Sequence, residues 1–164
     1  SLLTLEATTG SIEPNGLLTL KAGAGIVIED DMTSVTAGKA VVIDADYDGT
    51  GDGTLTVQTG EVITTNNSPL TITAWDLDLS GSVVTGTQNL FISGAQTSQT
   101  IGLGATSANM HIADEELQRM SADSGLTLGG STTTAGSMTV NEITAAGSDN
   151  LKPLVSLVAG HKEP

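Results

Sequence analysis

The chain has 164 residues, the length of one domain, and it combines 25 Thr and 20 Gly with one Trp, one Tyr and one Phe. Because Thr, Val and Ile favour strands while Gly, Asn and Asp favour turns, this composition predicts an all-β fold with few aromatic side chains in its core. The formal net charge of −14 excludes a basic surface for nucleic acid or anionic membranes, and the absence of cysteine excludes disulfides and thiolate metal sites.

A short phrase of alternating aliphatic residues recurs from the first residues onward. In each copy two or three aliphatic residues share one face of a strand, with Thr, Ser or Asp between them. The copies lie at 2–7, 17–23, 41–46, 70–76, 90–94 and 126–130. Shorter strands with the same alternation lie at 26–28, 55–57, 61–64, 101–103 and 138–140. Loose repeats of roughly 20 residues predict stacked coils of a right-handed parallel β-helix, a β-solenoid, over residues 1–150.

A β-sandwich is the alternative for a chain with so many short strands. A sandwich needs hairpin turns such as Asn-Gly or Asp-Gly between its strands, and most of the predicted strands are not joined by one. In a solenoid, like side chains stack above one another about 4.8 Å apart, so a core of Leu, Ile, Val and Ala suffices. The sequence therefore favours the solenoid.

The third copy of the phrase leads into an acidic loop. Asp44, Asp46 and Asp48 occupy alternate positions, Gly49 follows, and Asp52 lies four residues after Asp48. This spacing matches the first half of an EF-hand loop, in which carboxylates around a sharp turn bind Ca²⁺. Leu55 stands where an EF-hand has its bidentate Glu, and the flanking helices are absent. The loop is a candidate Ca²⁺ site, with a solvated acidic turn as the alternative.

The alternation changes phase within the fourth copy. Residues 70–74 place aliphatic side chains on one face; one residue later Trp75 and the leucines after it point inward, while Asp76 and Asp78 point outward. Such a slip predicts a corner between two faces. The two aspartates resemble the acid and base of polysaccharide-hydrolysing β-helices, but a solvated strand face is the simpler interpretation. We expect no enzyme activity.

Residues 114–121 break the strand pattern because they are rich in helix formers. Asp114 is the expected N-cap, and acidic residues in the first turn suit the helix dipole. Leu117 and Met120, three residues apart, are expected to close the end of a coil like a lid. An inserted helix would explain the 36 residues that separate Leu90 from Leu126.

Three further features carry weaker signals. His111 and His161 are 50 residues apart, so a zinc site or a Ser-His-Asp triad would require a coincidence of folding. Phe91 is out of phase with its aliphatic neighbours and is expected to be exposed. No apolar run approaches the roughly 18 residues of a membrane-spanning helix.

Both ends of the predicted solenoid are expected to present unpaired backbone edges, which add further strands unless they are capped or charged. Residues 151–164 are predicted to form a terminal strand and tail that docks to a neighbouring unit, with Pro153 as the obvious blocker. The residues expected to carry assembly are Leu2, Leu3, Leu5, Leu154, Leu157 and Val158.

The order of the phrases resembles the repeats of giant, filamentous-haemagglutinin-like secreted proteins over roughly residues 2–145. The segments that carry the resemblance are GLLTLKAGAGIVIED, VVIDADYDGTGDGTLTVQTGEVITT, SPLTITAWDLDLSGSV, TIGLG, IADEELQRM and GLTLGG. The resemblance implies a right-handed parallel β-helix that extends from a cell surface as an adhesin or matrix component.

The expected function is therefore that of a structural or adhesive segment of a secreted filament or cell-surface matrix. Its expected partners are copies of itself or adjacent coils. A calcium-dependent adhesin module that binds glycans or a protein is the alternative, and a polysaccharide-active enzyme is the second alternative.

Overall fold

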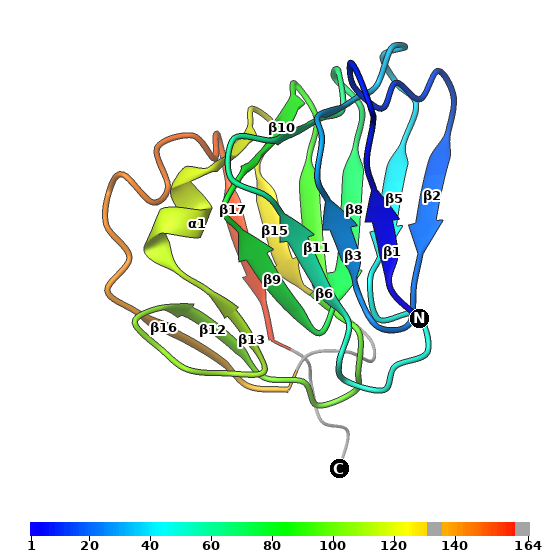
Figure 1. Cartoon of the computed structure of the whole chain (residues 1–164). Coiled ribbons are helices and arrows are strands. Elements are labelled where there is room, and N and C mark those ends of the chain that lie inside the picture. Colours follow the sequence, from blue (N-terminus) through cyan, green and yellow to red (C-terminus); the bar gives the residue numbers. More distant parts are fainter. Residues whose placement is uncertain (131–135, 160–164) are drawn as a thin grey trace.

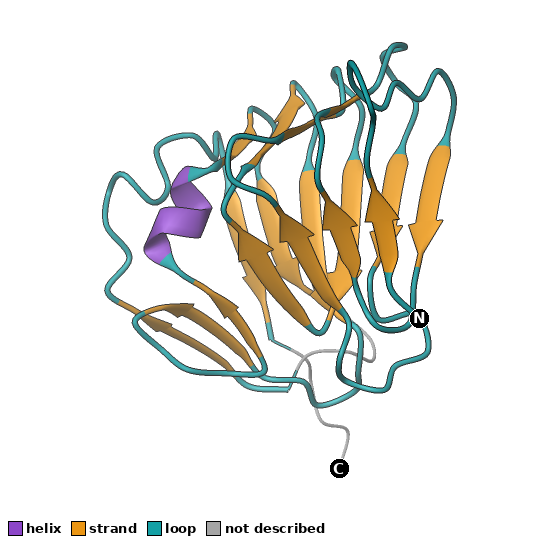
Figure 2. Ribbon diagram, in the orientation of Figure 1, coloured by secondary structure: helices purple, strands orange, loops and turns teal. Residues whose placement is uncertain are grey.

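The computed structural model describes residues 1–130 and 136–159, in which strands form nearly all of the regular structure and one short helix interrupts them (Figure 2). No helix in these residues is long and apolar enough to cross a membrane. The elements in chain order are β1 (Leu3–Leu5), β2 (Leu18–Lys21), β3 (Ile26–Ile28), β4 (Met32–Thr33), β5 (Val41–Asp44), β6 (Thr54–Val57), β7 (Val62–Thr64), β8 (Leu70–Ala74), β9 (Asp76–Leu79), β10 (Ser82–Gly86), β11 (Leu90–Gly94), β12 (Ile101–Gly104), β13 (Met110–Ile112), α1 (Asp114–Gln118), β14 (Met120–Ala122), β15 (Leu126–Gly129), β16 (Met138–Asn141) and β17 (Val155–Val158).

The strands form four sheets. Sheet A has the order β1-β3-β6-β9, sheet B the order β4-β7-β10-β14, sheet C the order β2-β5-β8-β11-β15-β17, and sheet D the order β13-β12-β16. After β2 the chain passes through sheets A, B and C in turn three times, and each strand pairs with its counterpart from the next passage. Figure 1 shows the strands side by side, from β1 and β2 at one end to α1 and sheet D at the other.

Every strand pair among the described residues is parallel. Hairpin-joined strands pair in antiparallel fashion, whereas parallel neighbours need a longer crossover connection. The part of the chain that the structure describes is therefore nearly all β with parallel sheets, and it does not form the hairpin-joined sandwich.

The predicted repeat phrases align in sheet C. Register pairs join Leu18 to Val41, Val41 to Leu70, Leu70 to Leu90, and Leu90 to Leu126. A second column lies two residues further along each strand and consists of Leu20, Ile43, Ile72, Ile92 and Leu128. The prediction that aliphatic positions line up in columns is confirmed for these copies of the phrase.

The first copy of the phrase was assigned wrongly to this series. Residues 3–5 form β1 of sheet A, where Leu3 pairs with Ile26 rather than with Leu18. Leu3 and Leu18 are only 15 positions apart, whereas the chain takes from 20 positions (Leu70 to Leu90) to 36 positions (Leu90 to Leu126) to return to the same sheet.

The core is aliphatic and continuous, and its largest fully buried side chains are Ile26, Ile28, Met32, Ile43, Leu55, Ile63, Leu70, Ile72, Leu79, Leu90, Ile92 and Ile101. The predicted corner is confirmed, because Ala74 ends β8 of sheet C and Asp76 begins β9 of sheet A. Trp75 lies at the corner itself and is half-buried rather than pointing fully inward.

The predicted helix exists, but its details differ. The N-cap is Ala113, and Asp114 is the first helical residue, because its carboxylate accepts a hydrogen bond from the Thr144 hydroxyl at 2.7 Å instead of capping the helix. Leu117 is buried, as expected. Met120 lies in β14, since the chain returns at that point to sheet B, where Met120 is fully buried.

The helix accounts for only part of the long interval between β11 and β15. The same interval contains β12 and β13, which form sheet D with β16. Sheet D lies at the end of the molecule that also carries α1, away from β1 and β2 (Figure 1).

Candidate functional site

Three of the four predicted carboxylates meet in the loop between β5 and β6. One carboxylate oxygen from each of Asp46, Asp48 and Asp52 lies within 4.8 Å of the others. Asp46 is 2% exposed, whereas Asp48 and Asp52 are exposed to solvent. Carboxylate oxygens are the ligands that hard divalent cations prefer, so this cluster could hold a metal ion.

Neutral donors hold the three carboxylates around one turn. The Asp46 carboxylate accepts hydrogen bonds from the backbone N–H groups of Thr50 at 3.2 Å and Gly51 at 3.1 Å. The Thr50 hydroxyl lies 2.9 Å from a carboxylate oxygen of Asp48 and 2.9 Å from one of Asp52. Because these donors carry no formal charge, they offset the repulsion among the carboxylates only in part.

Two glycines make room for this loop. A Cβ added at Gly23 would collide with the Asp48 carboxylate, and a Cβ added at Gly53 would collide with the carbonyl oxygen of Ala45. Leu55, at the twelfth position of the EF-hand pattern, is fully buried in β6. The loop therefore shares only its first half with an EF-hand.

Asp44 lies outside the cluster. It ends β5 beside Lys21 of β2, and its buried Oδ1 has no hydrogen-bond partner among the described residues. Burial raises the pKa of the Asp44 carboxyl, while the Lys21 ammonium lowers it and the Asp46 carboxylate raises it further. Asp44 thus adds negative charge beside the cluster without contributing a ligand atom to it.

Asp76 and Asp78 face outward from β9, but they do not form a free pair. The Asp76 carboxylate accepts the backbone N–H groups of Leu77 and His111, both at 2.9 Å. Burial raises the pKa of Asp76, and those two N–H groups lower it. One oxygen of Asp76 is therefore engaged by the backbone, in keeping with a structural role on the strand.

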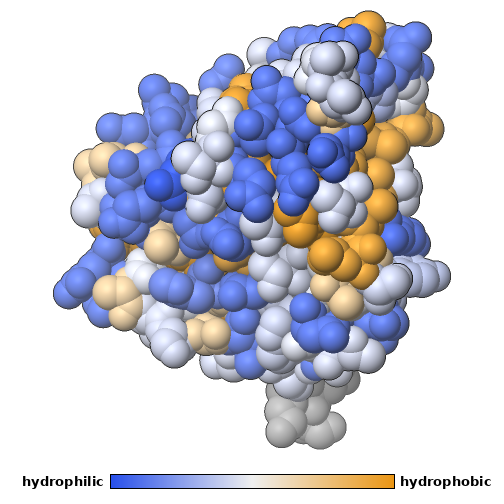
Figure 3. Space-filling view, viewed as in Figure 1, coloured by the Kyte–Doolittle hydropathy of each residue, from blue (hydrophilic) through white to orange (hydrophobic). Residues whose placement is uncertain are grey.

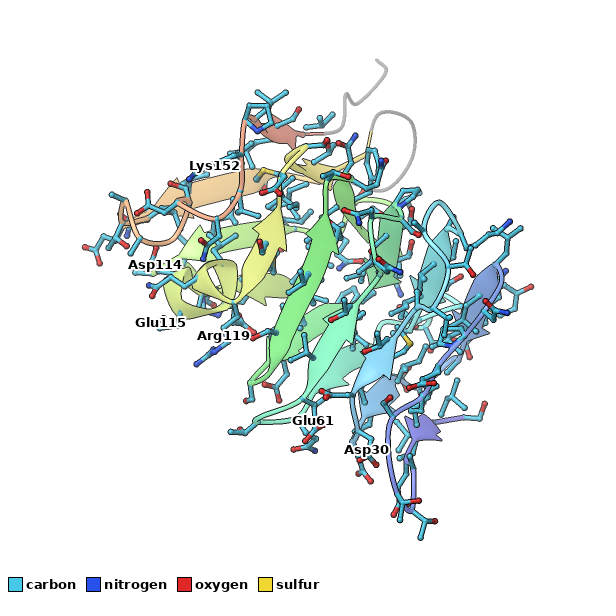
Figure 4. The ribbon with its side chains drawn as sticks, turned by 90° about the horizontal axis from the view of Figure 1, so that it is seen from above. Asp30, Glu61, Asp114, Glu115, Arg119 and Lys152 are labelled. Atoms are coloured by element: carbon cyan, nitrogen blue, oxygen red, sulfur yellow. The ribbon has the colours of Figure 1, made fainter. Side chains whose placement is uncertain are left out.

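Helix α1 closes the free edge of sheet A. The Glu116 carboxylate accepts the N–H of Leu79 through one oxygen and that of Ala113 through the other, both at 2.8 Å. Arg119 donates to the carbonyl oxygen of Leu79 at 2.8 Å, and it lies beside the helix in Figure 4. Burial raises the pKa of Glu116, and the aspartates of β9 raise it further.

The sequence interpretation missed Glu116 and Arg119. These side chains bond the N–H and C=O of Leu79, the last residue of β9, which is the end strand of sheet A. The helix-forming pattern of residues 114–121 predicts a helix, but nothing in it indicates which strand the helix meets.

The sequence also singled out His111, His161 and Phe91. The His111 ring nitrogen Nε2 lies 2.6 Å from the carbonyl oxygen of Gly104, and His161 lies outside the described residues. Within residues 1–130 and 136–159, the aspartate cluster is the one group of potential metal ligands. Phe91 is 37% exposed, as predicted.

The N-terminal end of the molecule is open and apolar. β1 is the end strand of sheet A and β2 is the end strand of sheet C. Leu2 and Leu17 are 61% and 77% exposed, and Leu3 and Leu5 are half-buried. Figure 3 shows hydrophobic side chains gathered at this end, and the helix lies at the opposite one (Figure 2).

The C-terminal end is open only in part. α1 covers the edge of sheet A, but β17 is the end strand of sheet C. Leu154 and Leu157 are 61% and 44% exposed, and Val158 is half-buried. A cavity of about 140 Å³ lies between β17, sheet D and α1. Its apolar lining includes Leu103, Leu117, Leu126, Val140, Val155 and Leu157.

Comparison of the chain with protein-family models, with curated proteins and with solved structures finds no match to any of the three. A proposal about function therefore rests on the residues and the geometry described above.

Proposed function

We propose that the chain is a segment of a right-handed parallel β-helix that serves as structural or adhesive material in a secreted filament or cell-surface matrix. It would act in the manner of filamentous-haemagglutinin-like proteins and without a catalytic centre. The observation that carries the proposal is sheet C, in which six parallel strands run in register and end in β2 and β17. Open edges of this kind add further strands end to end.

The right-handed helical path follows from a general rule of strand connections. The chain runs from β3 to β4 to β5, then from β6 to β7 to β8, then from β9 to β10 to β11, and each set pairs in parallel with the next. Crossover connections between parallel strands of one sheet are right-handed in almost all proteins. The repeated path supports the β-helix as the interpretation of sheets A, B and C, and the rule supports its right-handed sense.

Sedimentation velocity at increasing protein concentration tests end-to-end stacking. The formal charge of −14 on each copy opposes association, so we expect larger species to grow with concentration and more strongly in about 0.5 M salt than in about 0.1 M salt. A single monomeric species at every concentration and in both salts would contradict the proposal.

A second proposal concerns the acidic loop, for which we infer Ca²⁺ as the ion. A buried Asp46 beside the exposed Asp48 and Asp52 gives three oxygen ligands with room for water or a partner's oxygen atoms. The chain would then be a calcium-dependent adhesin module whose loop binds a glycan or a protein.

Calorimetric titration with Ca²⁺ tests the second proposal. We expect saturable binding that Asp48→Asn or Asp52→Asn weakens at least about tenfold, because each removes one charged ligand. Asp78→Asn is the matched control, since Asp78 is also exposed but lies on β9, outside the cluster. The second proposal would be contradicted if Asp78→Asn weakened Ca²⁺ binding as much as the two cluster variants do. It would also be contradicted if the unmodified chain bound no Ca²⁺.

A further inference from the structure

We infer that stacked copies join in one specific register, in which β2 of an added copy pairs in parallel with β17 of the copy before it, through sheet C alone. This inference rests on the proposed end-to-end stacking and names the surface that performs it. The two strands concerned are the outermost strands of the same six-stranded sheet.

One backbone hydrogen bond repeats between successive strands of sheet C. In each case the first aliphatic residue of one strand donates its N–H to a carbonyl oxygen of the neighbouring strand in sheet C. That carbonyl belongs to the residue just before the first aliphatic residue of the neighbouring strand. The series is Leu18 to Ala40, Val41 to Pro69, Leu70 to Asn89, Leu90 to Gly125 and Leu126 to Leu154, at 3.0–3.2 Å. The next donor in the series is Val155, and no acceptor for it occurs among the described residues. On β2 of the added copy, the corresponding acceptor for the Val155 N–H is the carbonyl oxygen of Leu17, the residue before Leu18.

The direction of the free groups follows from the geometry of a parallel ladder. Because Leu126 donates to Leu154 and pairs with Val155, Ser156 turns its N–H and C=O back toward β15. Val155 and Leu157 therefore turn theirs toward the open edge. On β2, Leu18 donates to β5, so Thr19 turns its N–H and C=O outward. Free donors and acceptors thus alternate at the same spacing on both edges.

The side chains match in the same register. When Leu18 of the added copy lies opposite Val155, Leu20 lies opposite Leu157, and both buried columns of sheet C continue across the junction. Val155 and Leu157 are 38% and 44% exposed and line the cavity of about 140 Å³, while Leu18 and Leu20 are half-buried. The added strand covers these four side chains together.

The two edge strands of sheet C carry few of the devices that block an edge. Native edge strands carry Lys, Pro or inward charges against unwanted pairing. Val155–Val158 has none of these, Pro153 lies outside the strand, two residues before it, and Lys21 stands only at the last position of β2. Sheet A cannot continue at this end because α1 occupies its edge. The contact joins two different surfaces, so it repeats head to tail and builds a filament rather than a closed dimer.

Cysteine cross-linking tests the register, since the chain contains no cysteine of its own. In the inferred pairing Thr19 of one copy lies opposite Ser156 of the other, at the roughly 4.8 Å spacing of paired strands, which suits a disulfide. We expect a mixture of the variants Thr19→Cys and Ser156→Cys to form a linked dimer under mild oxidation. Neither variant alone should do so. Thr71→Cys, in the middle of sheet C, is the control and should link to neither.

The outcomes separate this inference from the proposed function. Association without the selective cross-link, or cross-linking of Thr19→Cys with itself, would overturn the register while leaving stacking intact. Absence of association by sedimentation would overturn the stacking as well. As a second measurement, Val155→Pro should abolish association because it removes a free donor that β15 does not use, whereas Val155→Thr keeps the donor and should retain association. Equal association of these two variants would also overturn the register.

Discussion

Replacement of Ile72 by Ala should destabilise the protein by about 4 kcal/mol. Ile72 is fully buried, and its register neighbours Ile43 and Ile92 lie directly on either side of it in the second column of sheet C. With a strand held on both sides, the cavity left by the missing atoms can collapse only slightly, so the cost falls in the upper part of the usual range. Urea unfolding followed by circular dichroism measures the loss, which corresponds to a melting temperature lower by roughly 8–16 °C.

Leu20→Ala is the matched control, because Leu20 occupies the same column but is half-buried and has a register neighbour on one side only. Its cost in the dilute monomer should be about 1–2 kcal/mol. Equal losses for the two variants, or a loss below about 1 kcal/mol for Ile72→Ala, would refute the argument that stacking in columns stabilises the fold.

Three further predictions concern the sheet A edge and the acidic loop. Glu116→Ala should cost about 1–3 kcal/mol, since it leaves the N–H groups of Leu79 and Ala113 without their acceptor. Hydrogen exchange at the Leu79 amide should become faster, and an unchanged exchange rate would argue against the cap. Burial raises the pKa of Asp76 and of Glu116, so the folded state holds these protons more tightly than the unfolded state does. Their stabilising contribution is complete below the ordinary carboxyl pKa and is lost as the pH rises through the raised values. Calorimetry should therefore show that these two groups lower the melting temperature as the pH rises above the ordinary carboxyl pKa of about 4, with a shallower fall in Glu116→Gln; an equal fall in that variant would count against this cause. Gly53→Ala should cost about 2 kcal/mol or more, because the new Cβ meets the Ala45 carbonyl oxygen. An unchanged melting temperature would show that the backbone there has room.

The sequence predicted those features that depend on neighbouring residues. Alternation within a strand determines which side chains face the core, so the columns through Leu70 and Ile72 and the corner at 74–76 could be recognised from the pattern alone. The meeting of Asp46, Asp48 and Asp52 also followed from short spacing within one loop.

Other features depend on which edge a segment meets, and local pattern does not carry that information. The phrase at 2–7 has the same alternation as the later copies, but only the length of the chain between passages places it in sheet A. Ala113 replaces Asp114 as the N-cap, and Glu116 closes β9, because of contacts with residues more than 25 positions away. The pairing of β12 with β16 in sheet D likewise joins distant segments.

Small-angle X-ray scattering over a concentration series tests end-to-end growth most directly, since it reports length and cross-section separately. We expect the maximum dimension of the particles to increase with concentration while the cross-sectional radius of gyration stays constant. A maximum dimension that does not change, or a cross-section that widens as particles grow, would contradict the stacking of copies through sheet C.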